Sequence, residues 1–496
     1  MQGGKGRRGD GAMRIFDTSV QELKYKVLRE VARAAFEDRL EKGVLDIPQA
    51  VVPGPQPLMR CCIYKERAIV GERIKLAMGG DAKNPNMVEV LPIACDECPV
   101  EGIHVTESCR GCIAHRCMNA CPKNAITIIH QKAHIDQDKC IECGKCVAAC
   151  PYHAIVKSSR PCENACKVDA IRMGEDKKAV IDNEKCIACG ACVYQCPFGA
   201  ISDKSFILDA IGLLKQSQAN TAYKVYAVVA PSIYSQFVQQ GKVEQVVTGL
   251  KRLGFFSVVE AALGADMVAY QEARELTEKQ FLTSSCCPAF VTYVHKQFPL
   301  LAEHVSHNIS PMAQISQCIK QGDPGSKIIF IGPCIAKKAE QQLEKVRPYV
   351  DCVITFEELQ ALFDSREIEL SSLPETPLDN ASYFGRIFAR SGGLAAAVEQ
   401  ALKEQQLQAF DYKPVSCNGI TECKVALLKA QRGLLKENFI EGMACESGCI
   451  GGPACLTHGP KDKTEVDNYG KLAMEKRMSD AISVLAPQLV QRKAEQ

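Results

Sequence analysis

Two stretches of the chain each place four cysteines within eleven residues, in the order Cys-x2-Cys-x2-Cys-x3-Cys-Pro. The first begins at Cys140 and reads CIECGKCVAACP, and the second begins at Cys186 and reads CIACGACVYQCP. In ferredoxin-type loops three such cysteines hold one 4Fe–4S cubane, and the cysteine before proline binds a partner cubane. Zinc sites are the alternative, but they usually pair two Cys-x2-Cys knuckles across a longer gap. The spacing therefore favours iron–sulfur clusters over zinc.

Two further cysteine groups follow the same pattern less completely. The group that begins at Cys109 (CRGCIAHRCMNACP) has two extra residues in its loop, and the group of Cys162 and Cys166 (CENACKVDAI) keeps only the ending. All four endings are followed by the same Ala-Ile pair, which indicates an internal repeat. We expect Cys95 and Cys98 to supply the missing first pair, so that one two-cluster ferredoxin is inserted inside another. Three clusters or two are the alternatives, if Cys95, Cys98 and Cys162 are spare or bind another metal.

On this interpretation sixteen cysteines divide into four cubane ligand sets with none left over. Such an array moves electrons one at a time and has no catalytic surface of its own, so it implies a redox site at its end. The four expected sets are Cys109, Cys112, Cys117 with Cys150; Cys140, Cys143, Cys146 with Cys121; Cys186, Cys189, Cys192 with Cys166; and Cys95, Cys98, Cys162 with Cys196.

The cysteine content also limits where such a chain works. The chain has 28 cysteines in 496 residues, and its Gly- and Arg-rich start, residues 1–17, lacks the apolar segment of an export signal. In a reducing compartment, clustered cysteines are more often metal ligands than disulfides. The net charge of +2 provides no strong field for nucleic acid or an anionic membrane, and no apolar run is long enough to span a bilayer. We expect a soluble, cytoplasmic protein with neither a nucleic-acid nor a membrane partner.

Composition divides the chain into three parts. Residues 1–90 contain an amphipathic helix over Val20–Leu45 and a Pro-rich linker over Ile47–Met59. Residues 91–205 hold the motif cysteines in short segments, and we expect an α+β ferredoxin-like iron–sulfur domain there. Residues 206–496 alternate strand-like and helix-like stretches, which predicts an α/β domain with parallel sheets. Its expected elements are buried strands over Tyr223–Ala230 and Lys327–Ile331, strand-to-helix stretches over Ser257–Tyr270 and Val350–Leu362, a helix over Gly393–Gln408, and a helical tail in the last twenty residues.

Three short motifs lie on separate loops of the α/β part. They read LTSSCCPAF from Leu282, GPCIAKKAE from Gly332 and EGMACESGCIGGP from Glu441. Each follows a strand-like run or opens a turn, where sites on open sheets usually lie. In order, approximate spacing and lettering, the motifs resemble the signature loops of the FeFe-hydrogenases, over residues 206–470. The resemblance implies a two-lobed α/β catalytic domain that interconverts dihydrogen with protons and electrons.

The resemblance also implies a cofactor and its ligands. The family's active site joins a 4Fe–4S cubane through a cysteine sulfur to a two-iron centre that carries carbonyl, cyanide and a bridging dithiolate. The motif positions give Cys287, Cys334, Cys445 and Cys449 as the cubane ligands, with Cys449 as the bridge. Four thiolates for one cubane also make chemical sense without the family.

Further family positions match one by one. Cys286 occupies the proton-donor position, and the ordinary thiol pKa of about 8.5 suits that role. Lys337 matches the lysine that holds a cyanide, for which an ammonium is a good donor. Met443 matches a packing methionine at the diiron pocket. The segment that faces the other cyanide in the family corresponds to Ala230, Pro231 and Ser232.

The family's proton path has counterparts too. Glu272 and Glu275 lie upstream of the first motif in the segment QEARELTEK, and Ser306 aligns with the serine between those two glutamates. A Glu-x2-Glu pair on a helix is usually a solvated face, so this interpretation depends on the three motifs being in register. The expected order of the path is Cys286, Glu272, Ser306, Glu275 and then Lys279 near solvent.

The sequence departs from the common family pattern at a few loop positions. Gly332 stands where many relatives have Met, Ala289-Phe290 replaces Gly-Trp, and residues 451–454 replace a Gly-rich ending with Gln. These changes resemble a less-studied branch of the family and leave every expected ligand in place. Seven cysteines have no expected role beyond that of buried small hydrophobic residues: Cys61, Cys62, Cys318, Cys352, Cys417, Cys423 and Cys455. A further metal site at Cys417 and Cys423 is a less favoured alternative.

The main alternatives share the fold but belong to other classes. Non-enzymatic relatives that serve iron–sulfur assembly tend to keep the cubane cysteines and lose the features that serve the diiron centre, so Cys286 and Lys337 argue against that reading. A hydrogen sensor usually carries a signalling domain, which is not visible in the sequence. The expected partners are H2 and protons, a ferredoxin-like or other low-potential electron carrier, and cluster maturation proteins.

Overall fold

The computed structural model describes residues 16–99 and 102–491, and its N-terminal part is a layer of helices. Helix α1 (Ser19–Phe36) begins after Thr18, whose hydroxyl accepts a hydrogen bond from the Gln21 amide, and packs against α16 (Phe356–Ser365) of the C-terminal part. The Gly- and Arg-rich start lies almost wholly outside the described residues. The other helices of this layer are α2 (Leu40–Gly43), α3 (Ile47–Val51) and α4 (Ile63–Ala77).

Two expectations for this layer were wrong in detail. The helix predicted over Val20–Leu45 ends at Phe36, because Asp38 takes a left-handed conformation with φ of 54° that a helix cannot continue through. The Pro-rich stretch is also not linker throughout. Pro48 lies in the first turn of α3, where a missing backbone N–H costs nothing.

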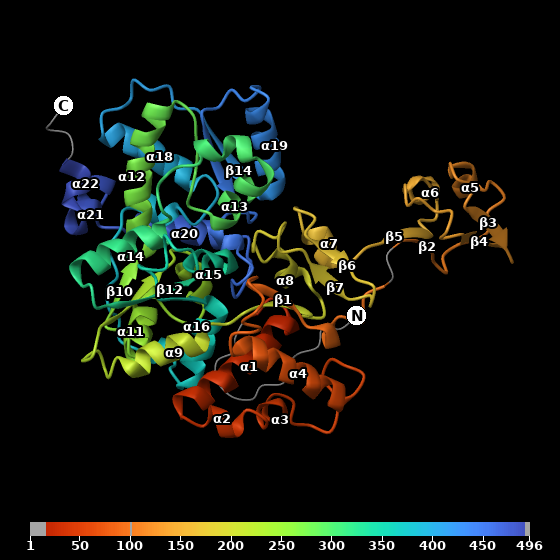
Figure 1. The fold of residues 1–496 in the computed structure, drawn as a ribbon, viewed down its shortest axis with the longest axis horizontal. Helices are drawn as coiled ribbons and strands as arrows, with labels where there is room; N and C mark the ends of the chain where they lie inside the picture. Colours follow the sequence, from red (N-terminus) through yellow and green to blue (C-terminus); the bar gives the residue numbers. More distant parts are fainter. Residues whose placement is uncertain (1–15, 100–101, 492–496) are drawn as a thin grey trace.

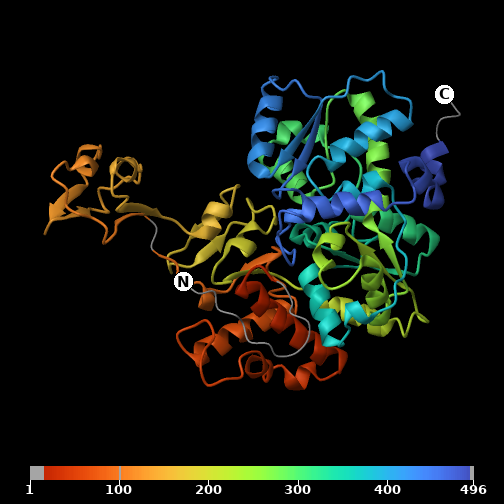
Figure 2. The ribbon, with the colours of Figure 1, turned by 180° about the vertical axis from the view of Figure 1, so that it is seen from behind.

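The C-terminal part contains two parallel sheets, one in each lobe (Figures 1 and 2). The strands of the first sheet are buried almost throughout, which is typical of a parallel sheet covered on both faces. Its order is β10 (Ser257–Glu260), β9 (Val225–Val229), β12 (Lys327–Gly332) and β13 (Cys352–Thr355). The second sheet has the order β11 (Leu282–Thr283), β15 (Phe439–Met443) and β14 (Pro414–Asn418).

Helix α12 (Ala261–Lys279) connects the lobes, because it follows β10 of the first sheet and packs against α14 (Pro311–Gly322) and α18 (Gly393–Glu404). The parallel sheets confirm the predicted α/β fold, and the predicted strands and strand-to-helix stretches all form. The remaining elements of this part are α9 (Ile207–Gln216), α10 (Ile233–Phe237), α11 (Val243–Leu253), α13 (Pro288–Gln297), η2 (Pro299–His304), α15 (Ile335–Gln341), η3 (Leu370–Ser372), α17 (Tyr383–Ile387), α19 (Ile420–Gln431), η4 (Cys449–Gly451), α20 (Asp462–Lys471), α21 (Met478–Leu485) and α22 (Pro487–Gln491).

Between these parts lies a ferredoxin-like region of short elements. Its two ends meet where β1 (Val88–Val90) pairs antiparallel with β8 (Ile201–Asp203). The hairpin of β6 (Ile171–Met173) and β7 (Ala179–Ile181) lies next to β1. The other elements here are η1 (Pro92–Ala94), α7 (Pro161–Ala165) and α8 (Ala191–Gln195).

Residues 102–158 form an arm that projects from the ferredoxin-like region (Figures 1 and 2). The arm begins with β2 (Gly102–Val105) and ends with β5 (Ile155–Ser158), which pair antiparallel, so both ends of the insertion lie side by side. Its other elements are α5 (Arg116–Asn119), β3 (Ile126–Ile129), β4 (Lys132–Ile135) and α6 (Lys145–Ala149). The strand pair makes the arm a separate unit, as the nested pattern of cysteines predicts. Within the described residues no helix is both long and apolar enough to cross a membrane.

Candidate active site

The cysteines of the three C-terminal motifs lie where strands of the two sheets end. Cys287 immediately precedes α13, Cys334 follows β12 and precedes α15, and Cys445 and Cys449 follow β15. Burial, together with the charges of neighbouring motif cysteines, raises the pKa of Cys334 to about 11 and that of Cys449 to about 12. The same neighbours act on Cys445, so the structure brings the four predicted cubane ligands together.

The four thiols suit a cluster better than a single ion. Among the described residues, no three His, Cys, Asp or Glu side chains converge closely enough to hold one metal ion. A cubane instead separates its thiolates by the width of the cluster, so its ligands need not touch one another. Of the four thiols, Cys445 alone lines the cavity of about 920 Å³ that also borders Cys189 of the ferredoxin-like region. The donor set itself therefore fits an iron–sulfur cluster.

Lys337 lies one helical turn beyond Cys334, with its ammonium group buried. Its Nζ donates to the Cys286 carbonyl oxygen at 3.2 Å and pairs with Glu340 Oε2 at 2.7 Å. Burial alone would lower the pKa of Lys337, but the Glu340 carboxylate, with further contributions from Cys334 and Cys286, outweighs it and the net shift is upward. The lysine is therefore a charged donor inside the protein.

Across the site, Ser232 follows β9 and is fully buried, and its Oγ has no hydrogen-bond partner among the described residues. An unpaired buried hydroxyl is costly, so this atom fits a polar group of a bound cofactor. The neighbouring predicted residues lie where the sequence suggests: Ala230 at the end of β9, Pro231 beside it, and Met443 buried at the end of β15.

Cys286 is buried beside the predicted ligand Cys287. Burial raises the pKa of Cys286 well above its ordinary value, and the charge of Glu272 raises it further. The ordinary thiol pKa expected from the sequence therefore does not apply at this position, and the thiol keeps its proton at neutral pH. Burial likewise raises the pKa of Glu272 to about 8, although the Ser285 amide, which donates to Oε1 at 3.2 Å, opposes the shift.

The predicted proton path lies along one face of α12 and ends at the surface. Glu272 Oε2 is buried and has no hydrogen-bond partner among the described residues, and Ser306 lies close enough to affect the pKa of that carboxyl. The Ser306 hydroxyl donates to Glu275 Oε2 at 3.0 Å, and Lys279 Nζ lies 2.9 Å from Glu275 Oε1. The exposed imidazole of His307 also contacts Glu275, with 3.2 Å between Nδ1 and Oε1. The predicted groups therefore follow one another from the buried thiol to solvent.

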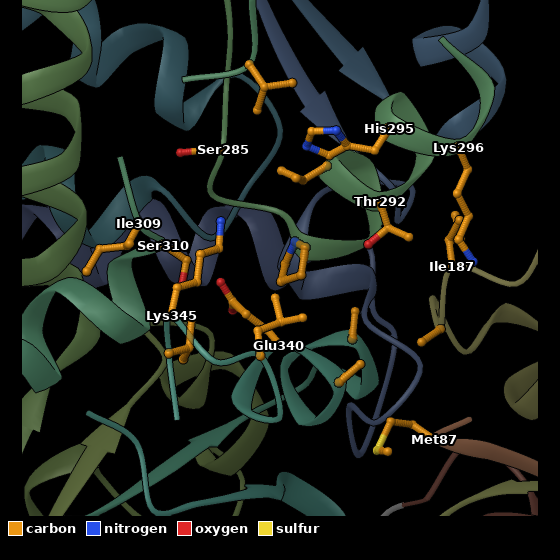
Figure 3. A pocket seen from close by; sticks show the side chains of 18 of the residues that line it. Met87, Ile187, Ser285, Thr292, His295, Lys296, Ile309, Ser310, Glu340 and Lys345 are labelled. Carbon is orange, nitrogen blue, oxygen red and sulfur yellow. The ribbon is translucent and has the colours of Figure 1, made fainter. Parts of the chain in front are cut away.

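A cavity of about 420 Å³ lies beside this path, between the C-terminal part and the ferredoxin-like region. Ser285, Ser306 and Glu340 all line it, and Figure 3 shows Ser285 and Glu340 among the side chains around it. The cavity connects the surroundings of Lys337 with the outer half of the proton path.

The structure also brings together each predicted accessory set. Burial raises the pKa of Cys192 well above its ordinary value, and the charges of Cys189, Cys186 and Cys166 add to the effect. In the Cys95 set, Cys196 and Cys98 raise the pKa of Cys162, and Cys196 and Cys95 raise that of Cys98. In the arm, Cys112 and Cys150 raise the pKa of Cys117, and Cys140 and Cys121 raise that of Cys146. Cys143 lines a cavity with Cys121, Cys140 and Cys146, and Cys109 accepts a backbone N–H from the arm.

Equivalent backbone contacts support the repeat. After each fourth cysteine, the N–H of the following Ala-Ile alanine donates to that cysteine's sulfur. Such N–H···S bonds stabilise a cluster's charge and tune its potential. The four nitrogen–sulfur distances are 3.3 Å for Ala125 and Cys121, 3.4 Å for Ala154 and Cys150, 3.2 Å for Ala170 and Cys166, and 3.2 Å for Ala200 and Cys196.

The outer and inner first pairs are equivalent as well. Cys109 accepts the Ala133 N–H at 3.4 Å, and Cys95 accepts the Ala179 N–H at 3.3 Å, each from the second strand of a hairpin. Cys95 therefore occupies in the outer unit the place that Cys109 occupies in the arm.

The accessory cysteines approach the C-terminal site at one loop. The charge of Cys189 contributes to the raised pKa of Cys445. Gly190, with φ of 79°, packs so closely that a Cβ there would lie 2.5 Å from Ile335 and 2.7 Å from Pro453. On the other side of this set, the charge of Cys162 contributes to the raised pKa of Cys192, so the Cys186 set and the Cys95 set lie next to each other. The sets thus form a series from the ferredoxin-like region to the C-terminal site.

Sequence reasoning missed some residues at the site. Glu340, the partner of Lys337, lies three residues along the same helix, and that i, i+3 spacing of opposite charges was a usable signal. His307 and Asn308, which both contact Glu275, had no signal outside the fold. Of the seven unassigned cysteines, Cys352, Cys417, Cys423 and Cys455 are buried as expected, Cys318 and Cys62 are half-buried, and Cys61 is exposed.

Together, the fold and the grouped cysteines define an iron–sulfur redox protein. A family model described as "Iron only hydrogenase large subunit, C-terminal domain" matches residues 223–453, and models of a 4Fe-4S binding domain and a 4Fe-4S dicluster domain match residues 179–202 and 101–151. The chain is 30% identical over 400 residues to iron hydrogenase 1 of Clostridium pasteurianum, covering 70% of this chain and 69% of that protein. The chain belongs to the iron-only hydrogenase large-subunit family.

Two other relatives mark the range of that family. The chain is 27% identical over 407 residues to the periplasmic Fe hydrogenase large subunit of Nitratidesulfovibrio vulgaris, covering 70% of this chain and 92% of that protein. It is also 36% identical over 142 residues to the cytosolic Fe-S cluster assembly factor NAR1 of Botryotinia fuckeliana, covering 24% of this chain and 25% of that protein. This match covers about a quarter of each chain, whereas each of the two hydrogenase matches covers 70% of this chain.

Proposed function

We propose that this protein is a hydrogenase that interconverts H2 with protons and electrons. The observation that carries the proposal is a buried thiol, Cys286, that lies beside the grouped motif cysteines and begins a chain of titratable groups leading to solvent. A cluster that only transfers electrons needs no such chain, because no proton has to leave it.

The residues present fit the cofactor that the family implies. Cys287, Cys334, Cys445 and Cys449 would hold the cubane, and Cys449 would also bridge to the two-iron centre. Lys337 and Ser232 would donate hydrogen bonds to its cyanide ligands, with Ala230, Pro231 and Met443 packed around it. When bound, this group supplies the metal centre at which dihydrogen is split or formed.

The protein's own groups then move the proton. Cys286 is protonated at neutral pH because it is buried. It would therefore give its proton to the reacting group and be reprotonated by Glu272. Glu272, Ser306 and Glu275 continue the exchange, and Lys279 holds the last carboxylate near the surface. Positioned transfer of this kind contributes about 10²–10⁴-fold to a rate.

Electrons would take a separate route through the accessory clusters. The Cys186 set lies next to the C-terminal site, the Cys95 set lies behind it, and the two sets of the arm lie farther out. Four accessory cubanes in series would pass electrons to or from a low-potential carrier. The iron–sulfur groups themselves depend on maturation proteins for their insertion.

A role in iron–sulfur assembly is the second candidate, favoured by the similarity to the assembly factor NAR1. That role would use the cubane cysteines but would assign no function to Cys286, Lys337 or the path to Lys279. Their arrangement therefore supports turnover of H2 over assembly.

Turnover and infrared spectroscopy test the proposal together. Protein matured with its clusters and purified without oxygen should evolve H2 from reduced methyl viologen and should reduce the oxidised dye under H2. Its infrared spectrum should contain bands of metal-bound CO and CN, a region where polypeptide is silent. CO and CN bands without turnover in either direction would contradict the hydrogenase and favour the sensing role, whereas cluster-loaded protein with neither bands nor turnover would favour the assembly role.

A further inference from the structure

Two adjacent cysteines that belong to no predicted cluster set lie at the surface of the N-terminal layer. Cys61 is exposed and Cys62 is half-buried, whereas four of the other five unassigned cysteines are buried. Cys62 is the N-cap of the 15-residue helix α4, and its Sγ accepts the Lys65 N–H at 3.4 Å. The Lys65 amide lowers the pKa of Cys62, and the Cys61 thiol and the charge of Lys65 act in the same direction. The two thiols therefore lie close together, and Cys62 is the better nucleophile of the pair.

Residues on both sides of the pair hold it against the first loop of the Cys95 set. Arg60, which directly precedes the pair, donates from Nη2 to the Ala94 carbonyl oxygen at 3.3 Å, and Ala94 is the residue before Cys95. On the other side of the pair, Lys65 Nζ forms an ion pair with Asp96, the residue after Cys95. These contacts fix the two thiols beside one accessory cluster, so the pair can receive electrons from that cluster.

Exposed apolar side chains surround the two thiols. Tyr64, in the first turn of α4, is 82% exposed, and Leu58, ahead of the pair, is 63% exposed. The amides of Leu58 and Met59 donate to Glu66 Oε2 at 2.6 Å and 3.3 Å, so the chain ahead of the pair folds back against the first turn of α4. Large apolar side chains that gather at one exposed place are typical of a surface that contacts another protein.

We propose that Cys61 and Cys62 form a redox-active dithiol that reduces a disulfide bond of a partner protein with electrons from the Cys95 cluster. The origin of these electrons in H2 rests on the proposed function, whereas the exchange at the two thiols does not.

The exchange consists of two attacks. The Cys62 thiolate attacks one sulfur of the partner's disulfide, and the partner's other sulfur leaves as a thiolate. The Cys61 sulfur then attacks Cys62, which releases the partner's first sulfur and leaves a disulfide between Cys61 and Cys62. The two protons that the pair loses pass to the two released sulfurs, so the partner gains two electrons and two protons.

The cluster then restores the pair. Two electrons, delivered one at a time, and two protons from solvent convert the disulfide between Cys61 and Cys62 back into two thiols. A bond between adjacent cysteines is strained, and strained, exposed disulfides are the readily reduced, catalytic kind. The site therefore converts single electrons of the cluster series into the two-electron reduction of a disulfide.

Reaction of the full, cluster-loaded protein with the disulfide reagent dithionitrobenzoate, without oxygen, tests the exchange. The wild type should release two aromatic thiols rapidly, because attack by Cys62 is followed by attack by Cys61. Cys61→Ser should release one and keep the other as a mixed disulfide, which mass spectrometry locates on Cys62. Cys62→Ser should react about tenfold more slowly or less, since the activated thiol is gone. Cys318→Ser, which removes a half-buried thiol elsewhere, is the matched control and should react like the wild type.

Return of the oxidised pair to thiols tests the link to the cluster. With reduced methyl viologen as the electron source, alkylation and mass spectrometry should find both thiols restored in the wild type. Cys95→Ser, which is expected to lack the adjacent cluster, should restore them at least about tenfold more slowly. With insulin as the protein disulfide, the wild type should reduce and precipitate its chains under the same conditions, and Cys62→Ser should not. Restoration with viologen but not with H2 would contradict the hydrogenase and leave the dithiol in place.

Three results would overturn the proposal. A Cys61→Ser protein that keeps no mixed disulfide would exclude the exchange. Equal restoration in Cys95→Ser and the wild type would exclude the link to the cluster. Loss of iron from Cys61→Ser and Cys62→Ser would show that the pair binds a cluster instead.

Discussion

The ammonium of Lys337 lies 2.7 Å from a carboxylate oxygen of Glu340, and both side chains are buried beside the candidate active site. The pair keeps a positive charge next to Cys286 without leaving it uncompensated in the protein interior. Its two partners are therefore expected to respond differently to substitution.

Lys337→Met should destabilise the protein strongly, because it leaves the Glu340 carboxylate buried and unpaired. Breaking one partner of a buried pair costs about 3–5 kcal/mol. Glu340→Gln should cost less, since an amide oxygen still accepts from the ammonium. Urea unfolding of the cluster-free proteins measures both, and the double variant Lys337→Met with Glu340→Leu should recover much of the loss. Equal stability of Lys337→Met and wild type would contradict the pairing.

Substitution of the two adjacent cysteines should separate proton transfer from cluster binding. Cys286→Ser is nearly isosteric but replaces a thiol by a far weaker acid, so CO and CN bands should persist while turnover falls about 10²–10⁴-fold. Cys287→Ser removes a predicted ligand and should reduce cluster content. Cys286→Asp, which restores a titratable group, should recover part of the activity. Near-normal turnover in Cys286→Ser would show that protons leave by another path and would remove the roles of Glu272, Ser306, Glu275 and Lys279.

Because Glu272 is buried and its pKa is raised, both H2 evolution and the free energy of unfolding should depend on pH. Its pKa of about 8 in the folded protein lies above the ordinary value of 4.5, so the folded state holds the proton more tightly than the unfolded state. The stability that this carboxyl contributes is present below pH 4.5 and is lost as the pH rises to about 8. H2 evolution should fall over the upper part of the same range, as the inward proton donor ionises.

Glu272→Gln is the matched variant, because it keeps the hydrogen bond from the Ser285 amide and cannot ionise. Its thermal stability should change less than that of wild type between pH 5 and 8, and its turnover should be low at every pH. A wild-type pH dependence in the variant would assign the titration to another group.

Iron content should distinguish the number of accessory clusters. Four accessory cubanes with the active-site cubane and diiron centre hold about 22 iron atoms, and two accessory cubanes would give about 14. Cys95→Ser should remove one cluster signal from the EPR spectrum of the reduced protein and leave the pair in the arm intact. A fully loaded wild-type protein near the lower value would contradict the nested pairing.

The alternation of strand-like and helix-like stretches predicted the parallel sheets, and the cysteine spacing predicted the inserted unit. The three short motifs, through the family that they resemble, predicted which groups lie together at the site. Spacing succeeds here because metal ligands must lie close in sequence when they come from one tight loop, as at Cys140 and Cys186. The end of α1 was missed, since the polar and apolar pattern continues past Phe36 while the backbone turns at Asp38. The raised pKa of Cys286 was also missed, because burial depends on side chains from distant segments. His307 could be placed beside Glu275 only after the fold brought together residues 32 positions apart.

The amide contacts after each fourth cysteine bear on timing. A one-electron carrier delivers or removes a single electron at each encounter, whereas every molecule of H2 requires a pair. Because the same backbone N–H faces a cysteine sulfur in all four repeats, this contact singles out no cluster as a deep trap. In an array of clusters with similar potentials, an electron can remain on one cluster between two encounters with the carrier. On the four-cluster arrangement, the protein would store the first electron until the second arrives, and the pace of carrier collisions would not have to match the pace of the chemistry.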